Sequence, residues 1–160
     1  GRETAKRAKA LGMNVIYTDI AGELKEFHEY KYMTMDDLLA QSDFVTLHVP
    51  YSGGKAVIGK EEIAKMKDGA YLINCARGGV VDEEALLEAL DADKLAGAAV
   101  DVYVEEPAKN CPLCNHEKVS CTPHIGASTM EAQERIGQEI IEIIIDFCEG
   151  GELNGCAESL

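Results

Sequence analysis

Three segments of the chain each place a polar residue just after an apolar, strand-like run. Arg77 lies in NCARGG, Glu106 in DVYVEEP and His124 in TPHIGAST. In an open α/β sheet, ligands bind at the carboxyl ends of the strands. A cation, a carboxylate and an imidazole gathered there could bind an anionic substrate and move a proton. The sequence therefore predicts a catalytic site made of these three residues.

Strand-like and helix-like segments alternate along the chain, which is typical of an α/β fold with one doubly wound parallel sheet. At least five parallel strands are expected in the domain. The expected strands cover residues 13–18, 44–49, 70–74, 96–102 and 119–122. The expected helices cover residues 2–11, 60–67 and 83–90, a short stretch after Thr34, and a long stretch from Ser128 to about residue 149.

Polar side chains mark the starts of three of these helices. Thr34 with Asp37 resembles a capping box, and so does Ser128 with Glu131. Asp82 is placed to cap the helix that follows it. The long final helix also carries apolar residues at helical spacing, which predicts one buried face. That face is made of Ile136, Ile140, Ile143 or Ile144, and Phe147.

The composition is that of an ordinary globular domain. The chain has 160 residues, of which 46% are apolar and 28% are charged. Its formal net charge of −14 disfavours nucleic acids and anionic membrane surfaces as partners. Six cysteines are too few for a disulfide scaffold, which favours a reducing cytosol. Cys75, Cys121 and Cys148 lie in apolar runs and are expected to be buried.

Over essentially its whole length, the chain resembles the nucleotide-binding domain of the D-isomer-specific 2-hydroxyacid dehydrogenases. The resemblance is carried by GRETAKR, LHVP, MKDGAYLINCARGGVVD, GAAVDVY and TPHIGAST. The stretch GASTMEAQ after His124 is most similar to the D-3-phosphoglycerate dehydrogenase branch of the family. The resemblance implies a Rossmann-like fold and an enzyme that uses NAD to oxidise a D-2-hydroxy acid. Oxidation of 3-phosphoglycerate to 3-phosphohydroxypyruvate, a step of serine biosynthesis, is the favoured reaction.

The resemblance also implies how the domain is divided. A nucleotide domain of this kind begins with a strand and a G-x-G-x-x-G turn, whereas this chain begins on a helix. Gly1 is therefore expected to be the last glycine of that turn, and the domain to be truncated at its N-terminus. Residues 1–153 are expected to form part of the NAD-binding domain, and residues 154–160 to begin the return to a substrate domain. Homo-oligomers and an inactive isolated chain are expected.

By the same resemblance, each of the three polar residues has a role. His124 is the acid/base, and an imidazole suits the alcohol proton because it titrates near neutrality. Glu106 stabilises the imidazolium, and the family pattern selects it over its neighbour Glu105. Arg77 clamps the substrate carboxylate with its guanidinium fork. Without the family, the two glutamates also fit an ordinary solvated acidic pair.

A further set of residues is implied to bind the cofactor. Asp19 ends the first expected strand and lies 18 residues after Gly1. That is close to the spacing of about 20 residues between the fingerprint glycines and a ribose-binding acid. Its charge would repel a 2′-phosphate, which predicts NAD over NADP. An ordinary turn aspartate is the alternative. Asp101 would hold the nicotinamide carboxamide. The other implied cofactor residues are Gly1, Val49, Cys75, Ala76, Arg77, His124, Gly126 and Ala127.

Other interpretations of the sequence remain open. The segment CPLCNH invites a metal site, but a second ligand pair at zinc spacing is missing, so no metal is predicted. His48 is expected to be structural. Two alternative functions are a regulatory, co-repressor-like NAD-binding protein of the same family and another 2-hydroxyacid dehydrogenase, such as a glycerate or hydroxypyruvate reductase.

Overall fold

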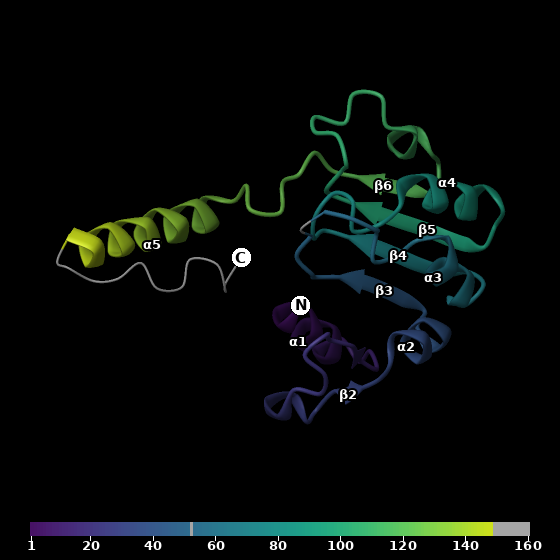
Figure 1. The fold of residues 1–160 in the computed structure, drawn as a ribbon, viewed down its shortest axis with the longest axis horizontal. Coiled ribbons are helices and arrows are strands. Elements are labelled where there is room, and N and C mark those ends of the chain that lie inside the picture. The colour runs from purple at the N-terminus through teal and green to yellow at the C-terminus, as the bar shows by residue number, and fades with distance from the viewer. Residues whose placement is uncertain (52, 149–160) are drawn as a thin grey trace.

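A computed structural model describes residues 1–51 and 53–148 and has the expected Rossmann-like α/β architecture, with parallel strands and flanking helices (Figure 1). Its main sheet has four parallel strands in the order β3-β4-β5-β6. These strands are β3 (Phe44–Leu47), β4 (Ala70–Asn74), β5 (Leu95–Val100) and β6 (Val119–Cys121). The helix α2 (Met35–Gln41) precedes β3, and α3 (Lys60–Lys65), α4 (Glu83–Asp91) and the 3-10 helix η2 (Pro112–Asn115) lie between consecutive strands in the sequence.

The core lies between this sheet and its helices. Leu72 of β4 packs in one cluster with Leu39 of α2 and with Leu86 and Leu90 of α4, and all four are almost fully buried. β3 alternates exposed and buried residues, as expected for a strand with one covered face. Burial of these leucines fixes the register of the strands, and with it the positions of their carboxyl ends.

The opposite face of the main sheet is open in the described part of the chain. Phe44 of β3 stacks on Tyr71 of β4 with ring centroids 5.0 Å apart, and their exposed fractions are 51% and 41%. These rings and Gly97 and Ala99 of β5 line a shallow hollow of about 560 Å³. A doubly wound sheet normally has helices on both faces. This apolar face is therefore left without a cover among the described residues.

The N-terminal part has a two-stranded sheet of its own, and Ile16 of β1 packs against the main core. After α1 (Arg2–Ala10), the short strands β1 (Ile16–Tyr17) and β2 (Lys31–Tyr32) pair in parallel, with the 3-10 helix η1 (Lys25–Phe27) between them. The described residues thus hold six parallel strands, so the prediction of at least five is confirmed, and these strands are divided between two sheets. No strand of residues 1–51 or 53–148 lies between β1 and β3 and pairs with both.

Two of the three predicted helix caps are confirmed. The Thr34 hydroxyl accepts the Asp37 N–H at 3.2 Å at the start of α2. The Asp82 carboxylate accepts two backbone N–H groups at the start of α4. The third prediction is wrong, because Thr129 caps the final helix in place of Ser128. The Ser128 N–H instead closes a turn before the helix.

The final helix, α5 (Met130–Cys148), projects away from the sheet (Figure 1). The predicted burial of its apolar face is wrong, since none of its described residues is buried. Periodicity identifies an apolar stripe on a helix but not the surface that covers it. The exposed stripe includes Ile136, Ile140, Ile144 and Phe147, with exposed fractions of 43% to 58%.

The cysteines also differ from expectation. Cys75 and Cys148 are exposed, so their predicted burial is wrong, and Cys121 is half-buried. All five cysteines in the described ranges are free thiols. None of the described helices is long and apolar enough to cross a membrane. The expected return segment, residues 154–160, lies outside the described residues.

Candidate active site

Glu106 and His124 are in direct contact. Glu106 Oε2 lies 2.8 Å from His124 Nδ1, and Glu106 Oε1 accepts the Tyr103 N–H at 3.0 Å. These hydrogen bonds, from His124 first and Tyr103 second, lower the pKa of the Glu106 carboxyl. The carboxylate therefore stays charged at neutral pH and fixes the imidazole through Nδ1. Nε2 is then the ring nitrogen left to exchange a proton with a ligand.

The turn that carries His124 is held by Asp101, which follows β5. Asp101 is only 5% exposed. Its carboxylate accepts the Thr122 hydroxyl at 2.5 Å and the N–H groups of Ile125 at 2.8 Å and Gly126 at 2.9 Å. Burial alone would raise the pKa of Asp101, but these hydrogen bonds outweigh it and the pKa is lowered. The charged carboxylate is thus built into the turn.

His124 itself has a backbone conformation that needs this support. Its φ of 56° lies in the left-handed region, which costs a non-glycine residue roughly 1–2 kcal/mol. The hydrogen bonds that the Ile125 and Gly126 N–H groups donate to Asp101 fix that conformation. The resemblance assigned Asp101 a cofactor contact, and its positioning role for His124 was missed. Only the folded turn reveals that role, because Asp101 is distant from His124 in sequence.

The loop that carries Arg77 is organised by Asn74, the last residue of β4. Asn74 is 3% exposed, and its side chain accepts the Ala76 N–H and donates to the Arg77 carbonyl, both at 3.1 Å. Arg77 Nη1 donates to the Ala76 carbonyl at 2.7 Å. Since a guanidinium has five N–H donors, most of the fork remains for an anion. Asn74 was missed, although a buried amide before a strand-end arginine was a usable signal.

Gly78 joins the Arg77 loop to the Glu106 loop. A Cβ at Gly78 would lie 1.8 Å from the Tyr103 carbonyl oxygen, so only glycine allows this backbone approach. The Glu83 carboxylate adds a second link, because it accepts the Val104 N–H at 2.8 Å. The three predicted catalytic residues therefore lie on connected loops at the carboxyl ends of β4, β5 and β6.

The expected cofactor residues are divided between the two sheets. Asp19 is exposed at the end of β1, and its Oδ1 accepts the Ala21 N–H at 2.8 Å, as in an ordinary turn. Gly1, at the start of α1, packs against His48 near the end of β3. Burial lowers the pKa of His48. The remaining expected residues follow the ends of main-sheet strands: Val49, Cys75, Ala76, Gly126 and Ala127.

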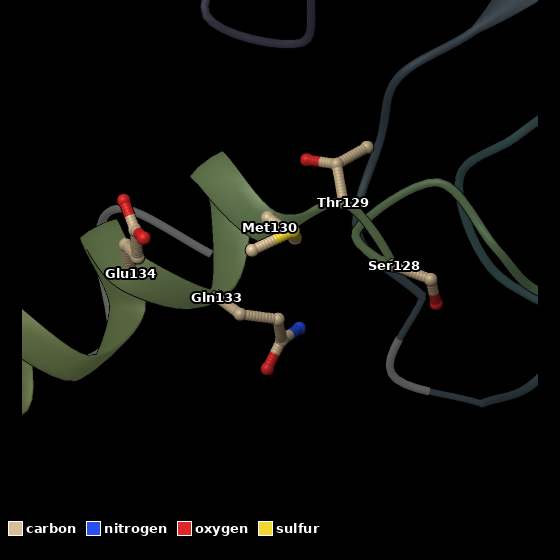
Figure 2. Close-up of a pocket in the computed structure, with 5 residues that line it drawn as sticks. All are labelled: Ser128, Thr129, Met130, Gln133 and Glu134. Carbon is tan, nitrogen blue, oxygen red and sulfur yellow. The ribbon is translucent and has the colours of Figure 1, made fainter.

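A separate open hollow of about 440 Å³ lies at the start of α5. Figure 2 shows its lining residues, with Thr129 and Glu134 pointing to one side and Ser128 and Gln133 to the other. These polar groups do not converge on a common point. Among the described residues, no three or more His, Cys, Asp or Glu side chains are placed so that they could hold one metal ion. The catalytic group is thus the site that the geometry favours.

The chain matches a protein family described as D-isomer specific 2-hydroxyacid dehydrogenase, NAD binding domain, over residues 1–126. It is 47% identical over 154 residues to a D-3-phosphoglycerate dehydrogenase of Archaeoglobus fulgidus, covering 94% of this chain and 29% of that relative. The D-3-phosphoglycerate dehydrogenase of Dictyostelium discoideum is 46% identical over 161 residues, covering 97% of this chain and 40% of the relative. The chain therefore spans less than half the length of these relatives.

Solved structures have the same fold. A glyoxylate reductase from Paecilomyes thermophila matches with a TM-score of 0.85 and 39% identity, over 91% of this chain and 45% of that one. A D-lactate dehydrogenase from Aquifex aeolicus, complexed with NAD and lactic acid, matches with a TM-score of 0.83 and 34% identity. That match covers 94% of this chain and 50% of the other.

Proposed function

Because the chain belongs to the D-isomer specific 2-hydroxyacid dehydrogenase family, as an NAD-binding domain, we propose that it supplies the catalytic residues for oxidation of a D-2-hydroxy acid. Membership of the family, and NAD as its cofactor, were both implied by the resemblance and are confirmed. The observation that carries the proposal is the 2.8 Å contact between Glu106 and His124, at a turn held by Asp101.

In the proposed reaction, His124 Nε2 removes the proton of the substrate hydroxyl. Glu106 stabilises the imidazolium that results, because its carboxylate is charged and lies against Nδ1. Arg77 binds the substrate carboxylate and orients the alcohol toward His124. NAD, when bound, accepts the hydride that leaves the alcohol carbon. Asp101 keeps His124 in place, and it is also proposed to contact the nicotinamide carboxamide.

For the substrate, we favour 3-phosphoglycerate, whose oxidation gives 3-phosphohydroxypyruvate for serine biosynthesis. The support is that relatives 40% to 47% identical to this chain are D-3-phosphoglycerate dehydrogenases. A second candidate is another 2-hydroxy acid, since a structure 39% identical to the chain is a glyoxylate reductase. Asp19, at the end of β1, is proposed to select NAD by binding the adenosine ribose.

A chimeric enzyme tests this function. The matching 154 residues of the Archaeoglobus fulgidus enzyme would be replaced by those of this chain, so that the remaining parts of that enzyme flank them. We expect NADH formation from 3-phosphoglycerate that exceeds the rate with glyoxylate-related 2-hydroxy acids. The unmodified relative is the positive control, and the same chimera carrying His124→Ala is the negative control. A folded chimera that binds NAD but turns over no 2-hydroxy acid would favour a regulatory NAD-binding role.

We also propose that the chain self-associates in the cytosol. The exposed stripe of α5 and the open face of the main sheet are apolar surfaces that water solvates poorly. Free thiols at all five described cysteines suit a reducing compartment. Light scattering at rising concentration should give a mass above 17.3 kDa. A constant monomer mass would contradict the association, and fractionation of the producing cells would test the location.

A further inference from the structure

Three cysteines gather beside the strand that leads to His124. Cys111 and Cys114 lie at the start of and within the 3-10 helix η2, and Cys121 is the last residue of β6. The Cys121 thiol donates to the carbonyl of Leu113, with a sulfur–oxygen distance of 3.6 Å. Cys121 therefore lies against η2, beside the residue that precedes Cys114.

A buried tyrosine lies beside the end of β6. Tyr103 is 6% exposed, and its hydroxyl donates to the Thr122 carbonyl at 3.0 Å and lies 3.3 Å from the Val100 carbonyl. Burial first, and then the neighbouring thiols of Cys121 and Cys114, raise the pKa of Tyr103. The Leu113 oxygen that accepts the Cys121 thiol belongs to the peptide bond that leads to Cys114, so the Cys121 sulfur lies next to the backbone of Cys114, an exposed residue.

Cys111 is engaged elsewhere. Its thiol donates to Glu83 Oε2 at 3.7 Å. Burial, reinforced by the charge of Glu83, raises the pKa of the Cys111 thiol and so disfavours the reactive thiolate. The sulfur of Cys111 is therefore directed to α4, whereas that of Cys121 lies against the Leu113–Cys114 peptide of η2.

We propose that Cys114 and Cys121 are a peroxide-sensitive thiol pair that closes to a disulfide beside the catalytic histidine turn. The Cys114 thiolate attacks one oxygen of hydrogen peroxide, the O–O bond breaks, and Cys114 becomes a sulfenic acid as hydroxide leaves. The Cys121 thiolate attacks that sulfur, the S–S bond forms, and a second hydroxide leaves. With the two thiol protons, the products are one disulfide and two waters. A thiol reductant reverses the reaction by exchange.

The disulfide would reach the catalytic turn through Thr122, the residue after Cys121. The Thr122 hydroxyl donates to Asp101, and Asp101 in turn accepts the N–H groups of Ile125 and Gly126. Pulling Cys121 toward η2 loosens these bonds. The effect on catalysis rests on the proposed function, whereas the disulfide and the loosened turn do not. Peptide mapping and hydrogen exchange detect these two changes without any turnover.

Peptide mapping tests the pair on the full 160-residue chain. The chain is treated with hydrogen peroxide, its remaining thiols are alkylated in denaturant, and it is digested with trypsin without reduction. Cleavage after Lys109, Lys118 and Arg135 places Cys114 in peptide 110–118 and Cys121 in peptide 119–135. A Cys114–Cys121 disulfide therefore joins two peptides, whereas a Cys111–Cys114 disulfide stays within one. We expect peptides 110–118 and 119–135 to be joined by a disulfide after peroxide treatment and to separate after reduction.

Matched variants assign the linkage. Cys114→Ser and Cys121→Ser should each abolish the joined peptides, whereas Cys148→Ser on α5 should keep them. A disulfide confined to peptide 110–118, joined peptides that survive Cys114→Ser, or no disulfide would each overturn the pairing. Hydrogen exchange at the Ile125 and Gly126 amides should be faster in the oxidised chain than in the reduced chain. Equal exchange in both would overturn the coupling to the catalytic turn.

Discussion

The carboxyl edge of the main sheet and the β1–β2 unit differ in how their polar residues are held. At the main-sheet edge, Asn74 and Asp101 are buried, and both have hydrogen-bond partners that position the Arg77 and His124 loops. In the N-terminal unit, each strand has two residues and α1 buries none of its side chains. Asp19 there is exposed and bonded within its own turn.

The proposed catalytic residues and the proposed cofactor-selecting residue, Asp19, therefore follow strands of different sheets. The proposed acid–base pair, Glu106 and His124, is fixed by buried polar side chains on a packed sheet, so it is organised before any ligand binds. Asp19, the proposed ribose-binding residue, follows a strand that no strand among the described residues joins to the main sheet. Catalytic preorganisation and cofactor affinity should therefore respond to different substitutions.

The largest expected effect comes from His124. In the chimera, His124→Ala should lower the rate of 2-hydroxy acid oxidation by about 10²–10⁴-fold, since it removes the general base. NAD affinity, measured by calorimetry, should stay within about a factor of ten. His28→Ala is the matched control, because His28 is an exposed histidine of the N-terminal unit. Equal rates for the two variants would exclude His124 from proton transfer.

Gly78→Ala should have the next largest effect. The added Cβ would lie 1.8 Å from the Tyr103 carbonyl, so the Arg77 and Glu106 loops must separate. We expect a loss of about 1–3 kcal/mol or more in the free energy of unfolding, as for overpacked cores. Gly137→Ala on α5 is the control, because no atom lies within 4 Å of its added Cβ. Equal urea midpoints would contradict the close approach of the loops.

Asp101→Asn should destabilise the chain by about 1–3 kcal/mol at pH 7, because it removes a charged acceptor of three hydrogen bonds. The pKa of Asp101 is lowered in the folded chain. Its contribution is therefore present above the unfolded pKa of about 3.9 and is lost as the pH falls through the lower folded value. Urea titrations should give a smaller difference from the unsubstituted chain in strong acid. A difference independent of pH would argue against a charged Asp101.

The smallest effect is expected at Asp19. Asp19→Ser removes the charge that repels a 2′-phosphate, so the preference for NAD over NADP should fall by about tenfold in the chimera, or roughly 1.4 kcal/mol. The rate with saturating NAD should change little, since the main-sheet edge is untouched. An unchanged ratio of the two affinities would make Asp19 an ordinary turn residue.

The sequence predicts Arg77, Glu106 and His124 after strands and in family motifs, and the structure brings Glu106 and His124 into contact. The hydrogen bonds of Asp101 depend on how distant segments fold together, so its positioning role was not predictable from local pattern. Those of Asn74 are local, to Ala76 and Arg77. The stripe on α5 was correctly located but wrongly expected to be buried, since periodicity does not specify a partner surface. The two-residue strand β2 is too short for a period-two signal.

We propose that main-sheet residues of this chain form the catalytic group, and that turnover also needs the further parts of the longer relatives, of which the chain spans less than half. Main-sheet residues hold Glu106 and His124 together, whereas β1 pairs with β2 and with no main-sheet strand. The direct test compares NADH formation from 3-phosphoglycerate by the 160-residue chain and by the chimera. The account predicts no turnover by the chain alone and roughly 1–10³ turnovers per second by the chimera. Turnover at such rates by the chain alone, or none by a folded, NAD-binding chimera, would contradict it.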